Sequence, residues 1–477
     1  MKTSMRFKPP TMLRKHKLRS LIIAGTVLAV VSGTTLAQSS PAKADPQTAL
    51  VVVGSDTIQD VWNGFTNGSP AATGFAAVPA ALGAGTAASY NATNPADGTF
   101  HQIITPQDGW ALQNGIVPNP NANFPLAPGD CNFARPNGSG EGVANLRLAL
   151  NANSTHATAA FAPAAGLGCV DIARSSSGVD TTDNNAAVDI QWVPFAIDAV
   201  TMATGPSTCS GTPNPCPSFT ADLGNGTTMN VNSVANTLGS AIGNMTVAQI
   251  SSLYNCNPVP VTVGGTTTTY IGTVTGQSVP AGDVGVDLYV PQSGSGTRKF
   301  WEGSSAANFL DSTVDTATGC VHDFIVGGPL AQSGTQTVKV PVEEHDGTAV
   351  STDPIGVGPF SIAQWISQQN PSHNPRFHAA VLQPIVVGGV VTPPFTVSGT
   401  TDSLNTSFPI LRYVYDVVKL SRLTAAGDPI GTLLNGVGST ICHAHALITG
   451  YGFALMSTSV FQDVACGAIL TANEGAP

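Results

Sequence analysis

The sequence predicts an α/β fold, on three observations. Apolar strand-like segments alternate with helix-like stretches along the chain, and loops rich in Gly, Pro, Thr and Asn separate them. Charged residues make up only 10% of the chain, against about 25% in an ordinary globular domain. Strands that alternate with helices are typical of a largely parallel sheet.

The elements follow from the same pattern, taken in chain order. The expected strands are Leu50 to Val53, Val170 to Ala173, Gln191 to Phe195, Val284 to Val290, Val338 to Val342 and Leu411 to Val418. The expected helices are Asp60 to Thr66, Val143 to Leu150, Val247 to Tyr254, Thr297 to Leu310 and Ser361 to Gln369. The stretches 66 to 130, 205 to 235 and 257 to 283 are rich in turn-forming residues, which predicts surface insertions.

The first 44 residues have the layout of a secretory signal peptide. Basic residues without an acid precede the apolar run Leu21 to Val31, and small residues offer cleavage after Ala37 or Ala44. A membrane anchor needs about 20 apolar residues, so this run is short for one. No cysteine lies near either cleavage site, which argues against a lipid anchor. We expect a secreted or extracytoplasmic protein.

The remaining chain of about 433 residues is long enough for two sizeable domains and is strongly acidic. Removal of residues 1 to 44 leaves 10 basic against 28 acidic residues, a net charge of about −18. Nucleic acid and anionic membranes both need a basic patch, so neither is an expected partner. A small anion stays compatible with this charge where backbone amides and hydroxyl groups bind it.

All eight cysteines lie after the signal peptide, and no CxxC metal spacing appears. An even number in a secreted chain indicates disulfides. We favour four sequential bridges. They join Cys131 to Cys169, Cys209 to Cys216, Cys256 to Cys320 and Cys442 to Cys466.

Two segments share one chemical design, Arg-Pro-Asn-Gly-Ser-Gly-Glu-Gly at 135 to 142 and Pro-Gln-Ser-Gly-Ser-Gly-Thr at 291 to 297. Each places Gly and Ser directly before a helix-like stretch, where unpaired backbone amides bind anions. A third loop, Ser55, Asp56 and Thr57, follows the first expected strand, and ligands of open α/β sheets bind at such strand ends. The alternative is that Asp56 or Thr57 only caps a helix.

The order of these pieces resembles the phosphate-binding proteins of ABC transporters, in the type 2 periplasmic-binding-protein superfamily. The matching pieces are Val-Gly-Ser-Asp-Thr at 53 to 57, Asn-Gly-Ser-Gly-Glu-Gly at 137 to 142, Val-Asp-Ile-Ala-Arg-Ser-Ser at 170 to 176, Val-Pro-Phe-Ala-Ile-Asp at 193 to 198, Met-Thr-Val-Ala-Gln-Ile-Ser-Ser-Leu-Tyr at 245 to 254, Gly-Ser-Gly-Thr at 294 to 297, Ile-Gly-Val-Gly-Pro-Phe at 355 to 360 and Phe-Pro-Ile-Leu-Arg at 408 to 412. No single piece is specific; the ordered set is.

The resemblance implies a two-lobed fold of the Venus flytrap kind, carrying the long loop insertions. Residues 45–197 and 378–477 would form one lobe and 198–377 the other. The protein would be a monomer that needs no cofactor, captures phosphate or a related oxyanion in the cleft and serves an ABC transporter permease. Hinge closure would bury the ligand. The resemblance carries ligand binding over to Thr57, Ser139, Ser295, Gly296 and Thr297. The full set of candidate ligand-binding residues is Ser55, Asp56, Thr57, Ser139, Gly140, Arg174, Ser175, Ser176, Ser295, Gly296, Thr297 and Arg298.

The chain also departs from the family. Pro291 and Ser293 stand where the phosphate binders commonly have an arginine and an aspartate, and their proton-accepting aspartate falls at Ser176. Arg174 and Arg298 can compensate by bidentate pairing with an oxyanion, unless they are solvated or salt-bridged. Asp56 is a substitute proton acceptor. Two further charged residues are expected to have structural roles: Glu141 caps a helix and Arg412 lies on a strand of the first lobe.

Two other classes of function stay open. Gly294-Ser295-Gly296 does not fit a nucleophile elbow, so no catalytic residue is expected. The histidines of three groups, 443/445, 373/378 and 343 to 346, have no spacing specific to a metal site, and exposed polar loops explain them equally well. We therefore expect no bound metal. A surface protein or adhesin on the same scaffold fits the long Thr- and Asn-rich insertions.

Overall fold

The computed structural model describes residues 50–83, 86–90, 92, 136, 138–150, 170–179, 189–205, 218–220, 228–230, 238–303, 309, 314, 319–331, 339–373, 375–398, 401–456 and 464–470. The chain divides into the units Met1–Pro41 and Ala42–Pro477, and all described residues belong to the second. The expected signal peptide, residues 1 to 44, lies outside the described residues, as do the cysteines at 131, 169, 209 and 216.

A mixed sheet of twelve described strands organises the second unit, in the order β2-β1-β3-β17-β4-β11-β9-β8-β7. In addition, β10 pairs with β9, and β12 and β18 pair with β4. The strands are β1 (Leu50–Gly54), β2 (Ala87–Ser89), β3 (Ile172–Ser175), β4 (Ile190–Thr204), β7 (Val259–Val263), β8 (Thr266–Gly272), β9 (Val284–Tyr289), β10 (Val321–His322), β11 (Gly356–Ser361), β12 (Val381–Leu382), β17 (Leu411–Lys419) and β18 (Ala454–Leu455). The α/β class is as predicted.

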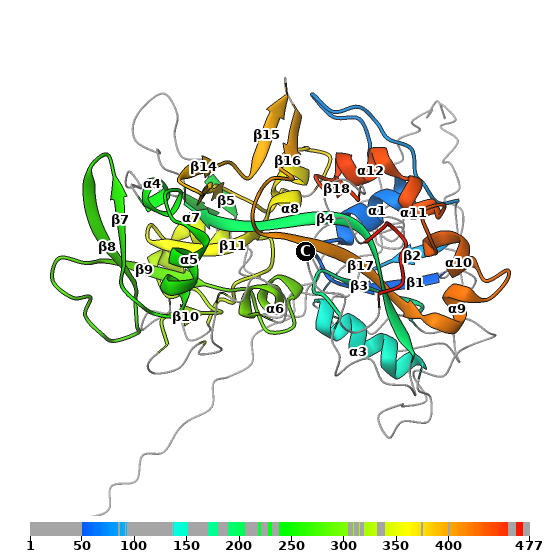
Figure 1. Cartoon of the computed structure of the whole chain (residues 1–477), viewed down its shortest axis with the longest axis horizontal. Coiled ribbons are helices and arrows are strands. Elements are labelled where there is room, and N and C mark those ends of the chain that lie inside the picture. Colours follow the sequence, from blue (N-terminus) through cyan, green and yellow to red (C-terminus); the bar gives the residue numbers. More distant parts are fainter. Residues whose placement is uncertain are drawn as a thin grey trace, which may run out of the picture. The chain divides into compact units, whose positions relative to one another are not determined.

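The prediction of a largely parallel sheet is wrong for the middle of the sheet. Parallel pairs join β1 to β2 and β3, and β9 to β8, β10 and β11. Between these groups, β17 and β4 run antiparallel to their neighbours. All fifteen residues of β4 are buried; its first part pairs with β17 and its last five residues pair with β11. Figure 1 shows β4 running from the side of β1 and β3 to the side of β9.

The described helices are short. They are α1 (Gln59–Asn67), α3 (Ser139–Leu150), α4 (Leu238–Ile242), α5 (Val247–Tyr254), α6 (Gly296–Glu302), α7 (Thr348–Thr352), α8 (Ile362–Ser367), α9 (Leu420–Thr424), α10 (Pro429–Leu434), α11 (Thr440–His443) and α12 (His445–Gly450), with the 3-10 turn η2 (Gly328–Leu330). Three hairpins lie outside the sheet, β5 (Ser218–Thr220) with β6 (Thr228–Asn230), β13 (Ile385–Val387) with β14 (Val390–Thr392), and β15 (Phe395–Ser398) with β16 (Thr401–Leu404).

Three expected elements differ from the structure. The helix expected to reach Leu310 ends at Glu302, because Gly303 adopts a left-handed conformation that terminates it. Within the expected strand at 338 to 342, the described residues make only an isolated bridge between Phe324 and Pro341. Part of the insertion expected at 257 to 283 forms β7 and β8, where Val259 and Val261 are buried and their neighbours are exposed.

Alternation along the strands explains how α1 and α3 cover opposite faces of β1 and β3. Val52 packs in one core with Val61 and Trp62 of α1. Its neighbour Val53 packs in a second core with Val143 and Leu146 of α3. Figure 1 shows the two helices on either side of these strands. The first turn of α3 lies against the end of β1, since a Cβ on Gly142 would lie 2.5 Å from the Cα of Gly54.

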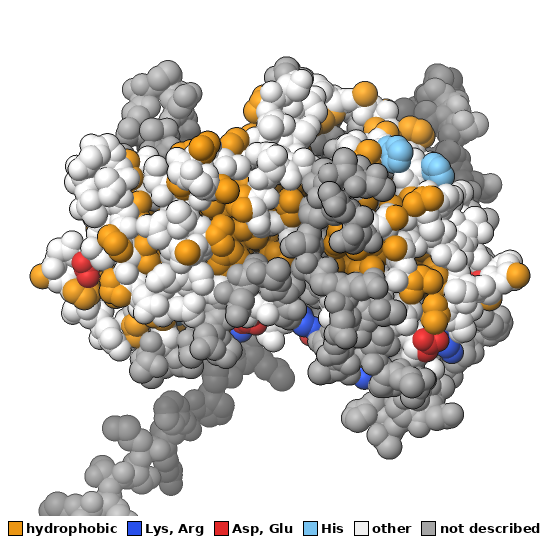
Figure 2. All heavy atoms as spheres, viewed as in Figure 1, with side chains coloured by type: hydrophobic (Ala, Val, Ile, Leu, Met, Phe, Trp, Pro, Cys, Tyr) orange, Lys and Arg blue, Asp and Glu red, His pale blue; other side chains and the backbone are white. Residues whose placement is uncertain are grey.

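Two disulfides join described cysteines, Cys256 with Cys320 and Cys442 with Cys466. Both pairs confirm the predicted sequential pairing. Few charged side chains appear on the face shown in Figure 2, in line with the low charged content of the chain. Within the part of the chain that the structure describes, no helix is long and apolar enough to cross a membrane.

Candidate functional site

The loop between β1 and α1 places Ser55, Asp56 and Thr57 in the interior, where all three are fully buried. The loop begins at Gly54, whose φ of 114° favours glycine, and a Cβ there would lie 2.5 Å from the carbonyl oxygen of Arg174. The Arg174 guanidinium donates to the carbonyl oxygens of Gly54, Ser55 and Tyr90 and to the hydroxyl of Ser89. Arg174 thus fixes the backbone of this loop.

Ser176, directly after β3, gathers the hydroxyl groups of the site. Its Oγ lies 3.1 Å from Ser55 Oγ, 2.9 Å from Thr57 Oγ1 and 3.3 Å from Ser139 Oγ. Its backbone amide donates to Ser139 Oγ. The side chain of Ser139 comes from the first turn of α3. Three segments that lie far apart in the sequence therefore contribute hydroxyls to one cluster.

The two Gly/Ser segments touch each other. The amide of Gly140 donates to the carbonyl oxygen of Gly294. A Cβ on Gly138 would lie 2.4 Å from the same oxygen, and a Cβ on Gly296 would lie 2.2 Å from the hydroxyls of both Ser139 and Ser176. A larger residue at Gly138 would collide with backbone, and one at Gly296 would displace the two hydroxyls. The start of α6 lies directly against the hydroxyl cluster.

Glu344, from the segment between β10 and α7, places its carboxylate on this cluster. Its Oε1 accepts hydrogen bonds from the hydroxyl of Thr57 and the amide of Thr297, both at 2.9 Å. Burial raises the pKa of Glu344, but hydrogen bonds with His345, Asp56 and Thr297 and the charge of His345 together hold that pKa well below its ordinary value. Glu344 is therefore a buried, ionised carboxylate on neutral donors.

Asp56 is the second buried carboxyl of the site. Its Oδ1 lies 3.8 Å from His345 Nε2, and its Oδ2 lies 3.7 Å from Arg376 Nη1. Burial, and next the charge of Glu344, raise the pKa of Asp56 well above its ordinary value, although Arg376 opposes them. The surroundings therefore favour the protonated form of Asp56 and the ionised form of Glu344. Two carboxyl groups at close range share a proton in this way.

His345 lies between these groups. Its Nε2 is 2.7 Å from Thr57 Oγ1 and 3.3 Å from Glu344 Oε1. Burial lowers the pKa of His345, so the ring is neutral near pH 7. The residue has a φ of 56°, in the left-handed region, which lets its ring meet the carboxylate of the preceding residue. The side-chain amide of Gln368 donates a hydrogen bond to the backbone carbonyl oxygen of His345.

The expectation of an exposed polar loop at 343 to 346 is wrong for Glu344 and His345, which are 0% and 2% exposed. The sequence singled out this stretch but gave no sign that it would meet the first loop. The buried Arg376 also went unrecognised. Its backbone amide donates to the side-chain oxygen of Gln368. Its guanidinium lies beside the Asp56 carboxyl and donates to the carbonyl oxygen of Glu344.

The predicted site residues divide into three groups. The hydroxyls or backbone of Ser55, Asp56, Thr57, Ser139, Gly140, Ser176, Gly296 and Thr297 converge as described. Ser295 caps α6 by accepting from the amide of Arg298, and Ser175 bonds Ser177. Arg174 and Arg298 form the third group: Arg174 binds the backbone of the first loop, and Arg298 pairs with Glu302 and Asp323. Arg412 has the predicted structural role, since it binds Asp198 through two nitrogens.

Comparison with known proteins gives only remote similarity. No family model and no curated protein matches the chain. A phosphate transport receptor from Vibrio cholerae is 11% identical, with a TM-score of 0.34 over 86% of this chain and 100% of that one. PstS from Borrelia burgdorferi is 10% identical, with a TM-score of 0.29 over 86% and 100%. A high-affinity periplasmic phosphate-binding protein, PfluDING, solved with bound phosphate, is 12% identical, with a TM-score of 0.33 over 86% and 91%.

These are proteins of the kind that the sequence resembles. All three TM-scores lie below 0.5, so the likeness says nothing about a ligand of this chain.

Proposed function

We propose that this chain is an extracytoplasmic solute-binding protein that captures a small oxyanion, phosphate or a related anion. The ligand would bind between the lobes 45–197 with 378–477 and 198–377, and an ABC transporter permease would receive it. The proposal assigns a binding role and no catalytic one. The proposed ligand-binding groups are the hydroxyls of Ser55, Thr57, Ser139 and Ser176 and the amide of Thr297.

The observation that supports the proposal is the position of the Glu344 carboxylate. One of its oxygens accepts from Thr57 Oγ1 and from the Thr297 amide, each at 2.9 Å. A carboxylate and a phosphate offer oxygen acceptors of the same kind, and both suit converging hydroxyl and amide donors. The donors of this site are therefore arranged to hold an oxyanion oxygen.

Binding of an external oxyanion requires that Glu344 leave these donors, because one hydroxyl proton serves one acceptor. Asp56 then loses the neighbouring charge that raises its pKa most after burial. A carboxylate freed in this way accepts the proton of a protonated oxyanion and repels an anion without one. Asp56 would then take the role of the proton-accepting aspartate that the phosphate binders have at the position of Ser176.

A second candidate is a surface or adhesin-type protein on the same scaffold, without transport. The same carboxylate supports it, because Glu344 already satisfies Thr57 and Thr297 from within the chain and needs no solute. Burial of the whole group excludes water and makes its exchange for a solute costly.

Calorimetric titration of the secreted protein with phosphate, sulfate and acetate tests the choice between the two. Solute binding predicts saturable heat with at least one anion. Thr57→Val should then weaken that binding about 10- to 100-fold, the worth of a hydrogen bond to a charged group. Thr262→Val, on the exposed side of β7, is the matched control and should bind as the wild type does. Absence of heat with every anion favours the surface protein.

A further inference from the structure

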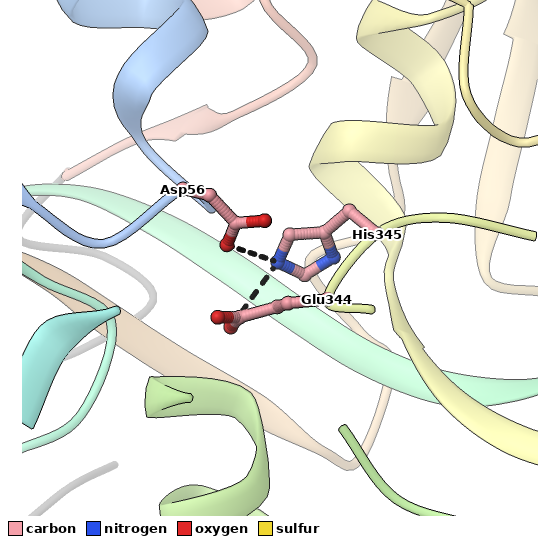
Figure 3. A group of neighbouring side chains, drawn as sticks. All are labelled: Asp56, Glu344 and His345. Atoms are coloured by element: carbon pink, nitrogen blue, oxygen red, sulfur yellow. Dashed lines mark ion pairs between the residues drawn. The ribbon is translucent and has the colours of Figure 1, made fainter. Parts of the chain in front are cut away.

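The carboxylates of Asp56 and Glu344 face the same ring nitrogen of His345 (Figure 3). Asp56 Oδ1 lies 3.8 Å and Glu344 Oε1 lies 3.3 Å from His345 Nε2. One ligand atom from each residue lies within 4.8 Å of the other two. All three side chains are buried, so the group is an interior cluster of two oxygens and one nitrogen.

We propose that Asp56, Glu344 and His345 bind a divalent metal ion, and that the ion is Zn²⁺. This goes beyond oxyanion binding and concerns the group with Glu344 in place, before an external oxyanion displaces it. The fourth position of the ion would be taken by water, because Thr57 Oγ1 lies 2.7 Å from His345 Nε2 and 2.9 Å from Glu344 Oε1, which is hydrogen-bond distance and too close for a further ligand of the same ion.

The spacing of the donor atoms fits a tetrahedral ion. Bonds of about 2.0–2.2 Å from Zn²⁺ to nitrogen and oxygen separate the ligand atoms by about 3.3–3.6 Å. The two distances to His345 Nε2, 3.3 and 3.8 Å, fall at or near this range. Mg²⁺ and Ca²⁺ prefer all-oxygen sites with six or more ligands, whereas an imidazole with carboxylates suits Zn²⁺.

An independent observation at the same place is the hydroxyl of Thr297. The residue is fully buried, and its amide already donates to Glu344. Its Oγ1 has no hydrogen-bond partner among the residues that the structure describes. A buried polar atom without a partner is costly and points to a bound ion, water or ligand beside it.

Charge favours a cation as well. Two buried carboxyl groups face each other here, and Arg376 pairs with one of them, Asp56, at 3.7 Å. A divalent ion neutralises both carboxylates at once, whereas a shared proton neutralises one.

The test uses the full secreted chain, stripped with a chelator and then given Zn²⁺, Mg²⁺ or Ca²⁺. We expect about one Zn²⁺ retained per chain after gel filtration, by elemental analysis, and a Tm raised by about 2 °C or more. Mg²⁺ and Ca²⁺ should give neither effect. Because the site is buried, loading is repeated during refolding from guanidinium with the disulfides intact.

His345→Gln should weaken Zn²⁺ binding by about 100-fold or more. Loss of a residue that only hydrogen-bonds to a metal ligand already lowers metal affinity by about 10- to 100-fold, and His345 is itself a proposed ligand. His443→Gln, at an exposed histidine, is the matched control and should bind as the wild type does. Co²⁺ added to the wild type provides a readout without a variant: its visible absorption should appear and Zn²⁺ should abolish it.

Two results would overturn the assignment. One is folded wild type that retains no Zn²⁺ after refolding and shows no Co²⁺ spectrum. The other is equal Zn²⁺ binding by wild type and His345→Gln. The anion titration is run separately with chelator present. Anion heat together with no Zn²⁺ retention in the loading experiment refutes the metal site alone, and Zn²⁺ retention without any anion heat refutes the oxyanion role alone.

Discussion

Thr57 Oγ1 lies 2.9 Å from Glu344 Oε1, although 287 residues separate the two in the chain. The same hydroxyl lies 2.9 Å from Ser176 Oγ and 2.7 Å from His345 Nε2. A threonine hydroxyl has one proton and can donate it to one acceptor at a time. Each of the other two neighbours must therefore donate to Thr57 Oγ1, or its contact with that oxygen is not a hydrogen bond. An anion or a metal ion that rearranges this group therefore changes the partners of all four residues.

Gly296 has no room for a side chain. A Cβ there would meet the hydroxyls of Ser139 and Ser176 at 2.2 Å, so Gly296→Ala must displace these hydroxyls or move the start of α6. We expect a loss of about 1–3 kcal/mol of unfolding free energy, the usual cost of overpacking, measured by urea denaturation. Gly438→Ala is the control, because a Cβ at Gly438 meets nothing within 4 Å. Equal stability of the two variants would contradict the close approach.

Arg412 and Asp198 form a buried pair beneath the site. Two guanidinium nitrogens contact Asp198 Oδ2 at 2.9 and 2.7 Å, and a third donates to the carbonyl oxygen of Ser176. Arg412→Leu leaves Asp198 buried without its counter-charge, which should cost about 3–5 kcal/mol in urea denaturation. The double variant Arg412→Leu with Asp198→Leu should recover much of the loss. A single-variant cost below about 1 kcal/mol would refute this role.

Asp416 of β17 makes stability depend on pH. Burial raises the pKa of Asp416 to about 8, although the hydrogen bond from Trp62 opposes it. In the unfolded chain the same group titrates near about 3.9. Between pH 4 and 8 the native state therefore binds more protons than the unfolded state, and stability falls as pH rises through that window.

Asp416→Asn removes this titration and keeps an oxygen that accepts from Trp62. We expect the decrease in Tm between pH 5 and pH 8 to be smaller in Asp416→Asn than in the wild type, by calorimetry. Glu141→Gln, at an exposed position on α3, should leave the wild-type slope unchanged. Parallel slopes for wild type and Asp416→Asn would show that Asp416 is ionised in the native state.

The local pattern of the sequence was enough to predict β1, β9 and β17 within about a residue or two, and α5 at its observed bounds. The loops after β1 and β3 and before α3 and α6 were also singled out as candidate ligand loops, because Gly and Ser at element ends have a direct physical use. Strand direction was not predictable: nothing in the residues of β4 shows that it pairs antiparallel with both β17 and β11.

The unpredictable strand topology also explains why the sequence did not place Glu344 and His345 in the site. Glu344 and His345 reach Thr57 only because the sheet topology brings the segment before α7 to the end of β1. The left-handed backbone at His345 then turns both side chains inward, and no local pattern marks a histidine for that conformation. The two arginines that the sequence offered as anion ligands instead bind partners within the chain, Arg174 on the first loop and Arg298 on Glu302 and Asp323.

The most direct test of the account is a calorimetric titration of phosphate into Glu344→Gln beside the wild type. The account predicts that the variant binds at least about tenfold more tightly, because its neutral amide competes less for the donors Thr57 and Thr297 and no longer repels the anion. Glu141→Gln should match the wild type. If wild type and Glu344→Gln bind phosphate equally, or if neither binds it, the claim that this group of donors is an oxyanion site occupied by Glu344 is contradicted.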